Sequence, residues 1–416
     1  MTLKTQQRKQ NADIVNIGGG VVGCSIAYYL SEYKAGNVIL IERNTIGSGN
    51  TGYAASLLTT VRKKTSVIPL VKETYKAMEV LENQYGCDIG RHEVGSLHVA
   101  SSDQSVADIL GLVDIARSHH IPNEWIDHAR IKEMVPWLAL EEIMRASYMP
   151  EDSYIDAYLL AHAFAKAASK NGVEIRQSTE VTNIEKSGGL IKGVKTSLGE
   201  TIETRMVIDA AGAWANILSL EIGIALPMAP VRSNYWITSP DRDKFPASQP
   251  IVILPDAQAY TRPESGGLLF GLREPNPPHF NPLELPGSLG GYAFGPPGEE
   301  WDILATNGQR MRRFFPDFEE MSIAHYIAGL STYTPDGLFI LGAMPGIEGF
   351  LAATGCSGAG VAGSGGMGRV IAELAMGIKP FSRIDDFNLM RFGEVNPLSV
   401  GFREKCAAAR ASKNSG

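Results

Sequence analysis

The feature that most constrains this chain is a glycine triplet between a short apolar segment and an apolar helix. The triplet is Gly18-x-Gly20-x-x-Gly23, and it directly follows residues 13–17, which are expected to form a short buried strand. Apolar residues then recur at helical spacing over 21–33, and a second apolar run covers 37–42. Strand, helix and strand within about 30 residues is the spacing of a parallel crossover. The segment therefore predicts a β-α-β unit with a glycine turn at its first junction.

Each glycine of the triplet has a physical reason to be there. Gly18 allows the tight turn from strand to helix, Gly20 lets the backbone approach a pyrophosphate, and Gly23 allows close helix–strand packing. The N-terminus of the helix offers unpaired N–H groups to phosphate. Glu42 ends the second strand, 24 residues after Gly18, where a carboxylate accepts hydrogen bonds from ribose. The pattern predicts a Rossmann-type dinucleotide site without separating NAD from FAD; a glycine turn with no ligand is the alternative.

Composition narrows the class of protein. The 416 residues suggest two or three domains, and a net charge of -7 argues against nucleic acid. The basic run 62–64 is expected in a solvated loop unless Arg62 turns inward. The four scattered cysteines predict reduced thiols and no metal site. Without an apolar leader or a run of about 18 apolar residues, we expect a soluble, cytoplasmic protein with no membrane span.

The rest of the chain alternates between helical and extended patterns. Helices are expected at 66–85, 104–119, 157–170 and up to Met376, and a strand at 96–100. Alternation over 228–273 predicts an antiparallel sheet. The Pro- and Gly-rich segment 275–301 is expected to be a long loop, either a lid or docking surface or a passive surface loop. The last dozen residues are expected to fray.

Three further glycine segments point to FAD. They are 47–52, a second loop able to reach phosphate; 209–215, a strand running into a glycine turn; and 355–366, a turn that opens a C-terminal helix. The N-terminus of that last helix is expected to face a flavin ring and favour negative charge on it.

These segments, with 154–156, 262–271, 334–336 and 357–369, resemble the D-amino acid oxidase superfamily. The glycine oxidase, sarcosine oxidase and dimethylglycine dehydrogenase branch fits best, over about residues 13–376. The resemblance implies a combined α/β and α+β fold, in which a Rossmann-type FAD-binding domain is interleaved with an antiparallel β-sheet substrate domain. The FAD-binding domain would comprise 1–85, 145–225 and 325–390, the substrate domain 86–144 and 226–324, and the C-terminal tail 391–416. The implied FAD contacts are Gly18, Gly20, Gly23, Glu42, Arg43, Ser48, Thr51, Val181, Gly212, Trp214, Gly358, Gly360 and Val361.

The chain departs from these relatives where they attach or tune the flavin. Tyr53 stands where dimethylglycine dehydrogenases carry a flavin-bonded histidine, and Gly329 where monomeric sarcosine oxidases carry a flavin-bonded cysteine. We therefore predict non-covalent FAD unless Cys356 is recruited, and we expect Cys356 to be a small buried residue. Leu269 replaces the lysine that promotes reaction with oxygen in sarcosine oxidases. The electron acceptor is thus either oxygen or an electron carrier.

The chemistry implied is oxidation of a secondary or N-methylated amine, such as sarcosine, glycine, proline or dimethylglycine. A hydride passes to flavin N5 and leaves an imine that water hydrolyses. Tyr260 is the expected substrate-facing hydroxyl, and Tyr235 on a neighbouring strand could share that role. Arg62 is the candidate carboxylate clamp, with Arg262 and Arg273 as rivals. A surface salt bridge is the expected alternative for each arginine.

Two other functions stay open. A flavin-dependent 2-hydroxy acid dehydrogenase wants a histidine base near the flavin, and no histidine lies within 228–273. An electron-relay subunit of a heteromeric amine dehydrogenase would bind FAD without being reduced by an amine. The 275–301 loop would then be its docking surface for a partner subunit.

Overall fold

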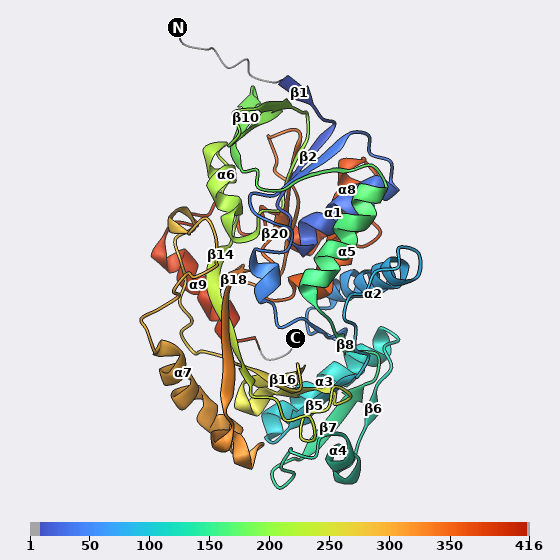
Figure 1. Cartoon of the computed structure of the whole chain (residues 1–416), viewed down its shortest axis with the longest axis vertical. Coiled ribbons are helices and arrows are strands. Elements are labelled where there is room, and N and C mark those ends of the chain that lie inside the picture. Colours follow the sequence, from blue (N-terminus) through green and yellow to red (C-terminus); the bar gives the residue numbers. More distant parts are fainter. Residues whose placement is uncertain (1–8, 414–416) are drawn as a thin grey trace.

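A six-stranded sheet forms the centre of the upper part of the molecule (Figure 1). The computed structural model describes residues 9–413. In spatial order the strands are β19 (Ile340–Ala343), β20 (Phe350–Thr354), β13 (Val207–Asp209), β2 (Ile14–Ile17), β3 (Val38–Ile41) and β9 (Glu174–Arg176). All neighbours pair in parallel except β19 and β20. Layers on both faces of this sheet explain why β2 and β3 are fully buried and apolar except at Asn16, whose side-chain amide donates to the Gly23 carbonyl at 2.8 Å.

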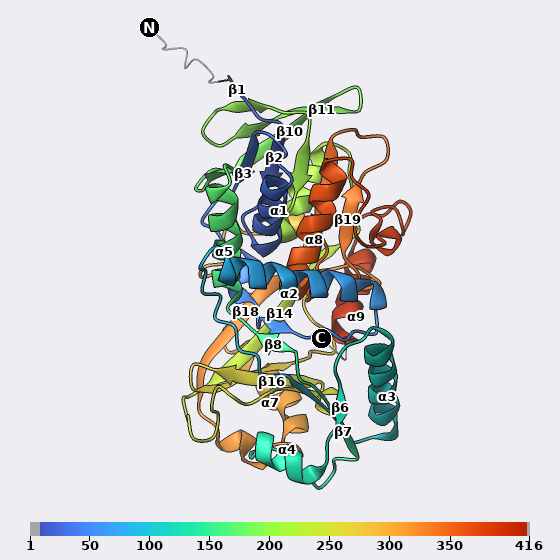
Figure 2. The ribbon, with the colours of Figure 1, turned by 90° about the vertical axis from the view of Figure 1, so that its right-hand side faces the viewer.

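Helices cover one face of this sheet and a smaller sheet covers the other. On the helical face lie α1 (Val21–Glu32), α2 (Ile68–Asn83), α5 (Ala157–Lys170) and α8 (Gly360–Ala375). Figure 2 shows α2 crossing below α1 and α8. On the other face lie α6 (Ala215–Glu221) and the sheet of β1 (Lys9–Asn11), β12 (Thr201–Glu203), β11 (Leu190–Thr196) and β10 (Val181–Ser187).

Helix α8 begins within the segment 355–366 that was expected to be a turn, and its glycines serve helix packing. A Cβ at Gly365 would lie 2.6 Å from the Thr74 Cα, and one at Gly368 would overlap Ser25. The glycines therefore let α8 approach the backbones of α2 and α1 closely. The expectation of a turn up to Gly366 was wrong: the chain becomes helical at Gly360.

An eight-stranded sheet forms the lower part. In spatial order its strands are β18 (Ile323–Tyr333), β14 (Ala229–Thr238), β17 (Gly267–Leu272), β16 (Ala259–Glu264), β15 (Ile251–Leu254), β5 (Ser96–Ala100), β7 (Arg145–Met149) and β6 (Glu124–Trp125). The pairs are antiparallel except β15 with β5, which is parallel. The predicted fold class is confirmed, with this one parallel pair as the difference.

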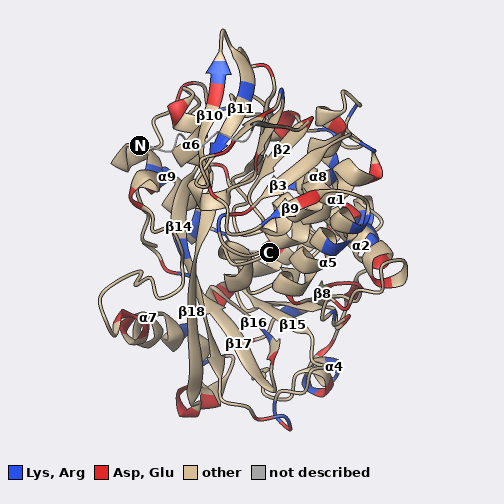
Figure 3. Cartoon of the chain, turned by 45° about the horizontal axis from the view of Figure 1, so that its top comes forward, with Lys and Arg blue, Asp and Glu red and all other residues tan. Residues whose placement is uncertain are grey.

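The lower sheet buries one face and turns the other toward the upper part. An aromatic core including Trp236 and Phe270 packs beneath it, with α4 (His128–Met134) and α7 (Glu299–Asn307). Helix α3 (Asp103–Ser118) packs on β5 and β7 through a separate cluster. The short pair β4 (Leu57–Leu58) and β8 (Ser153–Tyr154) lies between the two parts (Figure 1). Basic and acidic residues are interspersed over both parts (Figure 3).

The domain limits at 145 and 325 remain predictions. β7 and β18, which those limits assign to the FAD-binding part, hydrogen-bond in the eight-stranded sheet in continuous pairing with β5 and β14. Within residues 9–413, no helix combines the length and the hydropathy needed to cross a bilayer.

The expectation that the last dozen residues fray was wrong over the part that the structure describes. Helix α9 (Val400–Ala411) begins at Ser399, whose hydroxyl accepts from the Phe402 N–H. Cys406 is fully buried, and α9 packs against β14 and β18. A helix with one apolar face and a polar N-cap has reason to dock rather than fray. Residues 414–416 lie outside the described residues.

The close contact of α8 with α2 predicts that Gly365→Ala destabilises the chain. The added methyl group meets the Thr74 backbone and forces the helices apart, which costs about 2 kcal/mol of unfolding free energy. The control is Gly111→Ala on α3, where a Cβ meets nothing within 4 Å. That variant should gain about 0.5–1 kcal/mol from helix propensity. Urea denaturation measures both; equal effects of the two variants would contradict the packing argument.

Candidate active site

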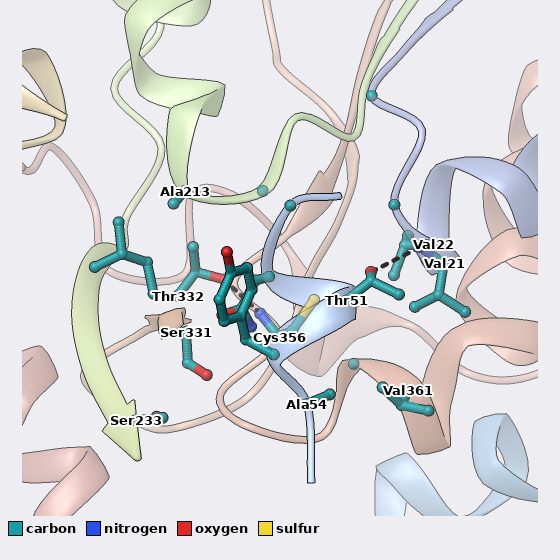
Figure 4. A pocket seen from close by; sticks show the side chains of 18 of the residues that line it. Val21, Val22, Thr51, Ala54, Ala213, Ser233, Ser331, Thr332, Cys356 and Val361 are labelled. Carbon is teal, nitrogen blue, oxygen red and sulfur yellow. Dashed lines mark hydrogen bonds between the residues drawn. The ribbon is translucent and has the colours of Figure 1, made fainter. Parts of the chain in front are cut away.

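A cavity of about 310 Å³ lies between the two parts and is lined by residues of both. Its upper end is formed by the glycine turn before α1, the loop 47–52 and the turn after β13. Its lower end is formed by β14, β16, the end of β17 and helix α9. Figure 4 shows the middle of the cavity, with Val21 and Thr51 on one side and Ser233, Ser331 and Thr332 on the other.

The glycine turn has the conformation that the triplet predicted. Gly18 has φ +106°, and a Cβ there would lie 2.5 Å from the Ala210 carbonyl oxygen. A Cβ at Gly23 would overlap the Gly18 carbonyl oxygen, so α1 can start against β2 only with glycine at this position. Gly20 lines the cavity, where a Cβ would approach only Thr51, at 3.2 Å.

The side chains of Thr51 and Glu42 fix the glycine turn by accepting hydrogen bonds from its backbone N–H groups. The Thr51 hydroxyl accepts from the Val21 N–H at 3.0 Å (Figure 4). The Glu42 carboxylate accepts from the Gly19 N–H at 2.7 Å and from the Asn44 N–H at 2.8 Å. Over residues 9–413, the N–H groups of Gly20 and Val22 make no hydrogen bond. Free donors at a helix N-terminus, beside a glycine that leaves room, fit the pyrophosphate of a dinucleotide.

Arg43 and Trp214 come together at the upper end. The Arg43 guanidinium lies 4.1 Å from the centroid of the Trp214 ring, and both residues line the cavity. The Trp214 indole donates to the Pro286 carbonyl at 2.8 Å, which ties the 275–301 loop to this wall. Leu289 of the same loop lines the cavity. The loop therefore contributes to the site, unlike a passive surface loop.

The N-terminus of α8 also opens into the cavity. Gly358 has φ +70°, and Gly360 and Val361 begin the helix. No side chain caps this helix, and the N–H groups of residues 360–362 have no partner within the described chain. These donors suit the negative charge that a reduced flavin ring develops.

The residues at the positions where relatives attach the flavin offer neither an imidazole nor a thiol. Gly329 packs against Tyr53: a Cβ at Gly329 would lie 2.8 Å from the Tyr53 Cβ. Cys356 lines the cavity and is partly buried, and its N–H donates to the Thr332 hydroxyl at 3.0 Å. Burial raises the pKa of the Cys356 thiol to about 12, so the neutral thiol persists at physiological pH.

Two tyrosines from the eight-stranded sheet line the lower end. Tyr260 lies over Gly271 on the neighbouring strand, where a Cβ would overlap its ring. Tyr235 comes from β14 and is 9% exposed. Burial raises the pKa of both phenols, so both keep their protons and can donate a hydrogen bond.

The three candidate arginines have different fates. Arg62 turns inward, lines the cavity, and donates to the Thr59 carbonyl at 2.9 Å. Arg273 also lines the cavity, and within residues 9–413 neither arginine forms an ion pair. The expectation of surface salt bridges was therefore wrong for both, because each side chain is buried and lines the cavity. Arg262 pairs with Glu264 at 2.7 Å and does not line the cavity.

The cavity brings together every predicted site residue except Gly23, which serves the packing of α1 on β2, and the rival arginine Arg262. Those present are Gly18, Gly20, Glu42, Arg43, Ser48, Thr51, Arg62, Val181, Gly212, Trp214, Tyr235, Tyr260, Gly358, Gly360 and Val361. Sequence reasoning missed Arg410 and Lys413 at the C-terminal end of α9, which line the lower end. The apolar spacing of Phe402 and Cys406 was the signal for a docked helix.

Comparison with known proteins adds three findings. A family model described as DAO, FAD dependent oxidoreductase, matches residues 13–374. The mitochondrial pyruvate dehydrogenase phosphatase regulatory subunit of Mus musculus is 29% identical over 401 residues, which make up 95% of this chain and 44% of that protein. The mitochondrial dimethylglycine dehydrogenase of Rattus norvegicus is 28% identical over 387 residues, which make up 91% of this chain and 44% of that enzyme.

The chain thus spans less than half the length of these two relatives. Among solved structures, the L-proline dehydrogenase from P. horikoshii matches with a TM-score of 0.81 and 26% sequence identity. The match covers 94% of this chain and 100% of that one.

The open space beside Gly20 predicts that Gly20→Ala weakens FAD binding while sparing the fold. The methyl group meets only Thr51 in the protein but enters the space next to the free N–H groups. We expect the Kd for FAD to rise about tenfold, equivalent to about 1.4 kcal/mol. Titration followed by flavin fluorescence measures the Kd, and thermal melting of the apoprotein checks the fold. An unchanged Kd, or a collapsed apoprotein melting temperature, would count against this assignment.

Proposed function

The chain belongs to the DAO family of FAD dependent oxidoreductases, and from this premise we propose that it oxidises a secondary or N-methylated amine that carries a carboxylate. The match confirms the predicted family and the predicted cofactor. The observation that carries the proposal is one cavity that joins the glycine turn and the α8 N-terminus to two tyrosines and a buried arginine.

The upper end of the cavity would hold FAD. The free N–H groups at Gly20 and Val22 suit the pyrophosphate, Glu42 suits a ribose, and the N-terminus of α8 suits the flavin ring. When bound, FAD would supply the acceptor for the hydride, which carries both electrons away from the C–H next to the amine nitrogen. The substrate is left as an imine, which water hydrolyses to an amine and a carbonyl compound.

The lower end would bind and orient the substrate. The Arg62 guanidinium would pair with the substrate carboxylate, and the Tyr260 hydroxyl would hydrogen-bond to the substrate beside the reacting carbon. Hydride leaves a neutral amine more readily than an ammonium ion. Positive side chains and an aromatic wall both disfavour the ammonium form and so lower the pKa of the bound amine.

Non-covalent FAD follows from the contact between Tyr53 and Gly329. Neither side chain offers a thiolate or an imidazole, and the packing of one against the other leaves no space for a larger residue at 329. We expect acid precipitation to release all the flavin into the supernatant as FAD, as measured by absorbance at the flavin band. Yellow colour that stays with the precipitate would show a covalent link and direct attention to Cys356.

The acceptor we favour is an electron carrier. Leu269 stands at the position where sarcosine oxidase relatives place the oxygen-activating lysine, and it is 1% exposed on β17. Without that cation, the electrostatic help for superoxide formation is missing. The solved structure with a TM-score of 0.81 is that of a dehydrogenase, which is consistent with this choice.

A second candidate function is a non-catalytic or electron-relay subunit. The observation that favours it is the similarity to a regulatory subunit over 95% of this chain. The 2-hydroxy acid alternative is weaker, because no histidine lines the cavity within residues 9–413.

Anaerobic titration separates these functions. Under the main proposal, sarcosine, dimethylglycine, proline or a related amine bleaches the oxidised flavin band. Bleaching by 2-hydroxy acids alone would support the alternative dehydrogenase, and no bleaching by any compound would support the relay subunit. Readmitting air then distinguishes an oxidase, which recovers its colour at once, from a dehydrogenase.

Removal of one hydroxyl tests the role of Tyr260. We expect Tyr260→Phe to slow flavin reduction about tenfold, because a hydrogen bond to the substrate is worth about 1–1.5 kcal/mol. The control is Tyr326→Phe on β18, which packs on the opposite face of the same sheet. Stopped-flow absorbance measures both rates; equal rates for Tyr260→Phe and the unmodified enzyme would remove Tyr260 from the site.

A further inference from the structure

Four cationic side chains line the lower end of the cavity. Arg62 comes from the loop after β4, Arg273 directly follows β17, Arg410 lies in the last turn of α9, and Lys413 follows that helix. Segments far apart in the sequence thus bring four positive charges to one end of one cavity. The acidic residues that line the cavity, Glu42 and Glu180, belong to its other end.

The three arginines are buried without ion-pair partners in the part of the chain that the structure describes. Arg62 and Arg410 are each 5% exposed and Arg273 is 7% exposed, yet none forms an ion pair within residues 9–413. The Arg62 Nε atom is buried with no hydrogen-bond partner. The Arg410 Nε donates only to the Ser233 hydroxyl, at 3.1 Å.

Elsewhere the same chain compensates a buried arginine fully. Arg232 is 2% exposed and binds two carboxylates, Glu274 at 2.5 Å and Glu299 at 2.6 Å. Burying a charge without a partner is costly, so this pairing is the usual arrangement. The cluster in the cavity is the exception, which indicates that its counter-charge arrives with a ligand.

The acidic groups nearest the cluster do not balance it. Asp152 faces Arg62 without forming an ion pair with it: its carboxylate accepts from the Ser96 hydroxyl at 2.6 Å and the Thr60 N–H at 2.8 Å, and its single charge offsets at most one of the four cations. Asp336 faces Lys64 and pairs with Arg391 at 2.8 Å. The Lys413 ammonium donates to the carbonyls of Ser357 and Gly358 at 3.1 and 3.0 Å, which leaves its charge uncompensated.

The electrostatics support the same conclusion. Burial and the neighbouring Arg410 lower the pKa of Arg273 to about 10. Burial and the other cations of the cluster also lower the pKa of Lys413. A lowered pKa in both side chains means that the protonated, positively charged forms are destabilised at this end of the cavity.

We propose that the amine substrate carries two carboxylates rather than one. This inference rests on the proposed function and specifies its substrate class. A guanidinium binds one carboxylate through two parallel hydrogen bonds. A monocarboxylate would leave most of the cluster uncompensated, whereas a dicarboxylic amine places one group at Arg62 and the other at Arg273 and Arg410, beside Tyr260.

Sarcosine and iminodiacetate form a matched pair of probes, since iminodiacetate is sarcosine with a second carboxylate on the methyl carbon. We expect the half-saturating concentration for flavin reduction to be at least about tenfold lower for iminodiacetate or for N-methylaspartate than for sarcosine. Equal or better use of sarcosine than of both dicarboxylates would overturn the inference.

A binding measurement separates this inference from the proposed function. Glutarate and butanoate have no amine, so each can perturb the flavin spectrum by binding but cannot reduce it. Tighter binding of glutarate with no reduction by any amine would keep the dicarboxylate site and reject the amine oxidation. Reduction by amines together with equal binding of glutarate and butanoate would support the amine oxidation and reject the dicarboxylate site.

Variants on α9 assign the second carboxylate site. Arg410→Gln should raise the half-saturating concentration of iminodiacetate about tenfold more than that of sarcosine, and Arg410→Lys should restore part of the loss. Lys405→Gln, on the exposed face of the same helix, is the charge-matched control and should change neither. Lys413→Gln provides a second test if Arg410→Gln loses its flavin. Equal effects on both substrates would remove α9 from substrate binding.

Discussion

The junction between β2 and α1 is the constraint on which the rest of the structure depends. Gly18 turns with a positive φ, and Gly23 lets the helix start against the carbonyl of Gly18. This contact aims the first turn of α1, with its free N–H groups, into the cavity. Glu42 and Thr51 then bind two of the turn's other N–H groups, so the loops after β3 are placed by the same junction. The end of the cavity that we propose for the pyrophosphate is thus a consequence of backbone packing.

The opposite end depends on long-range assembly. The eight-stranded sheet supplies Tyr235, Tyr260 and Arg273, the loop after β4 supplies Arg62, and the C-terminal helix supplies Arg410. The cationic side chains at this end form no ion pairs within residues 9–413. Arg232 on β14, by contrast, is buried with two carboxylate partners. Free backbone N–H groups and charges of both signs at one end, with excess positive charge at the other, fit the proposal of an anionic amine bound beside a flavin.

Much of the fold could be predicted because its signals are local. The glycine triplet, the apolar strands around it and the helix 157–170 follow from short-range spacing, and their bounds are close to those observed. The inward turn of Arg62, the docking of α9 and the parallel pairing of β15 with β5 could not be predicted in this way. The docking of α9 and the pairing of β15 with β5 depend on contacts between residues more than a hundred positions apart. The direction of Arg62 depends on how its loop lies once the two parts have packed together.

The glycines of α8 illustrate the same limit. Their number predicted a turn, yet Gly365 and Gly368 are helical and allow close contact with α2 and α1.

The most direct measurement of the central claim is the cofactor content of the native protein. We predict an oxidised-flavin absorbance band with FAD equimolar to the chain, either as purified or after incubation with FAD. A colourless protein that takes up no FAD under native conditions would contradict the account.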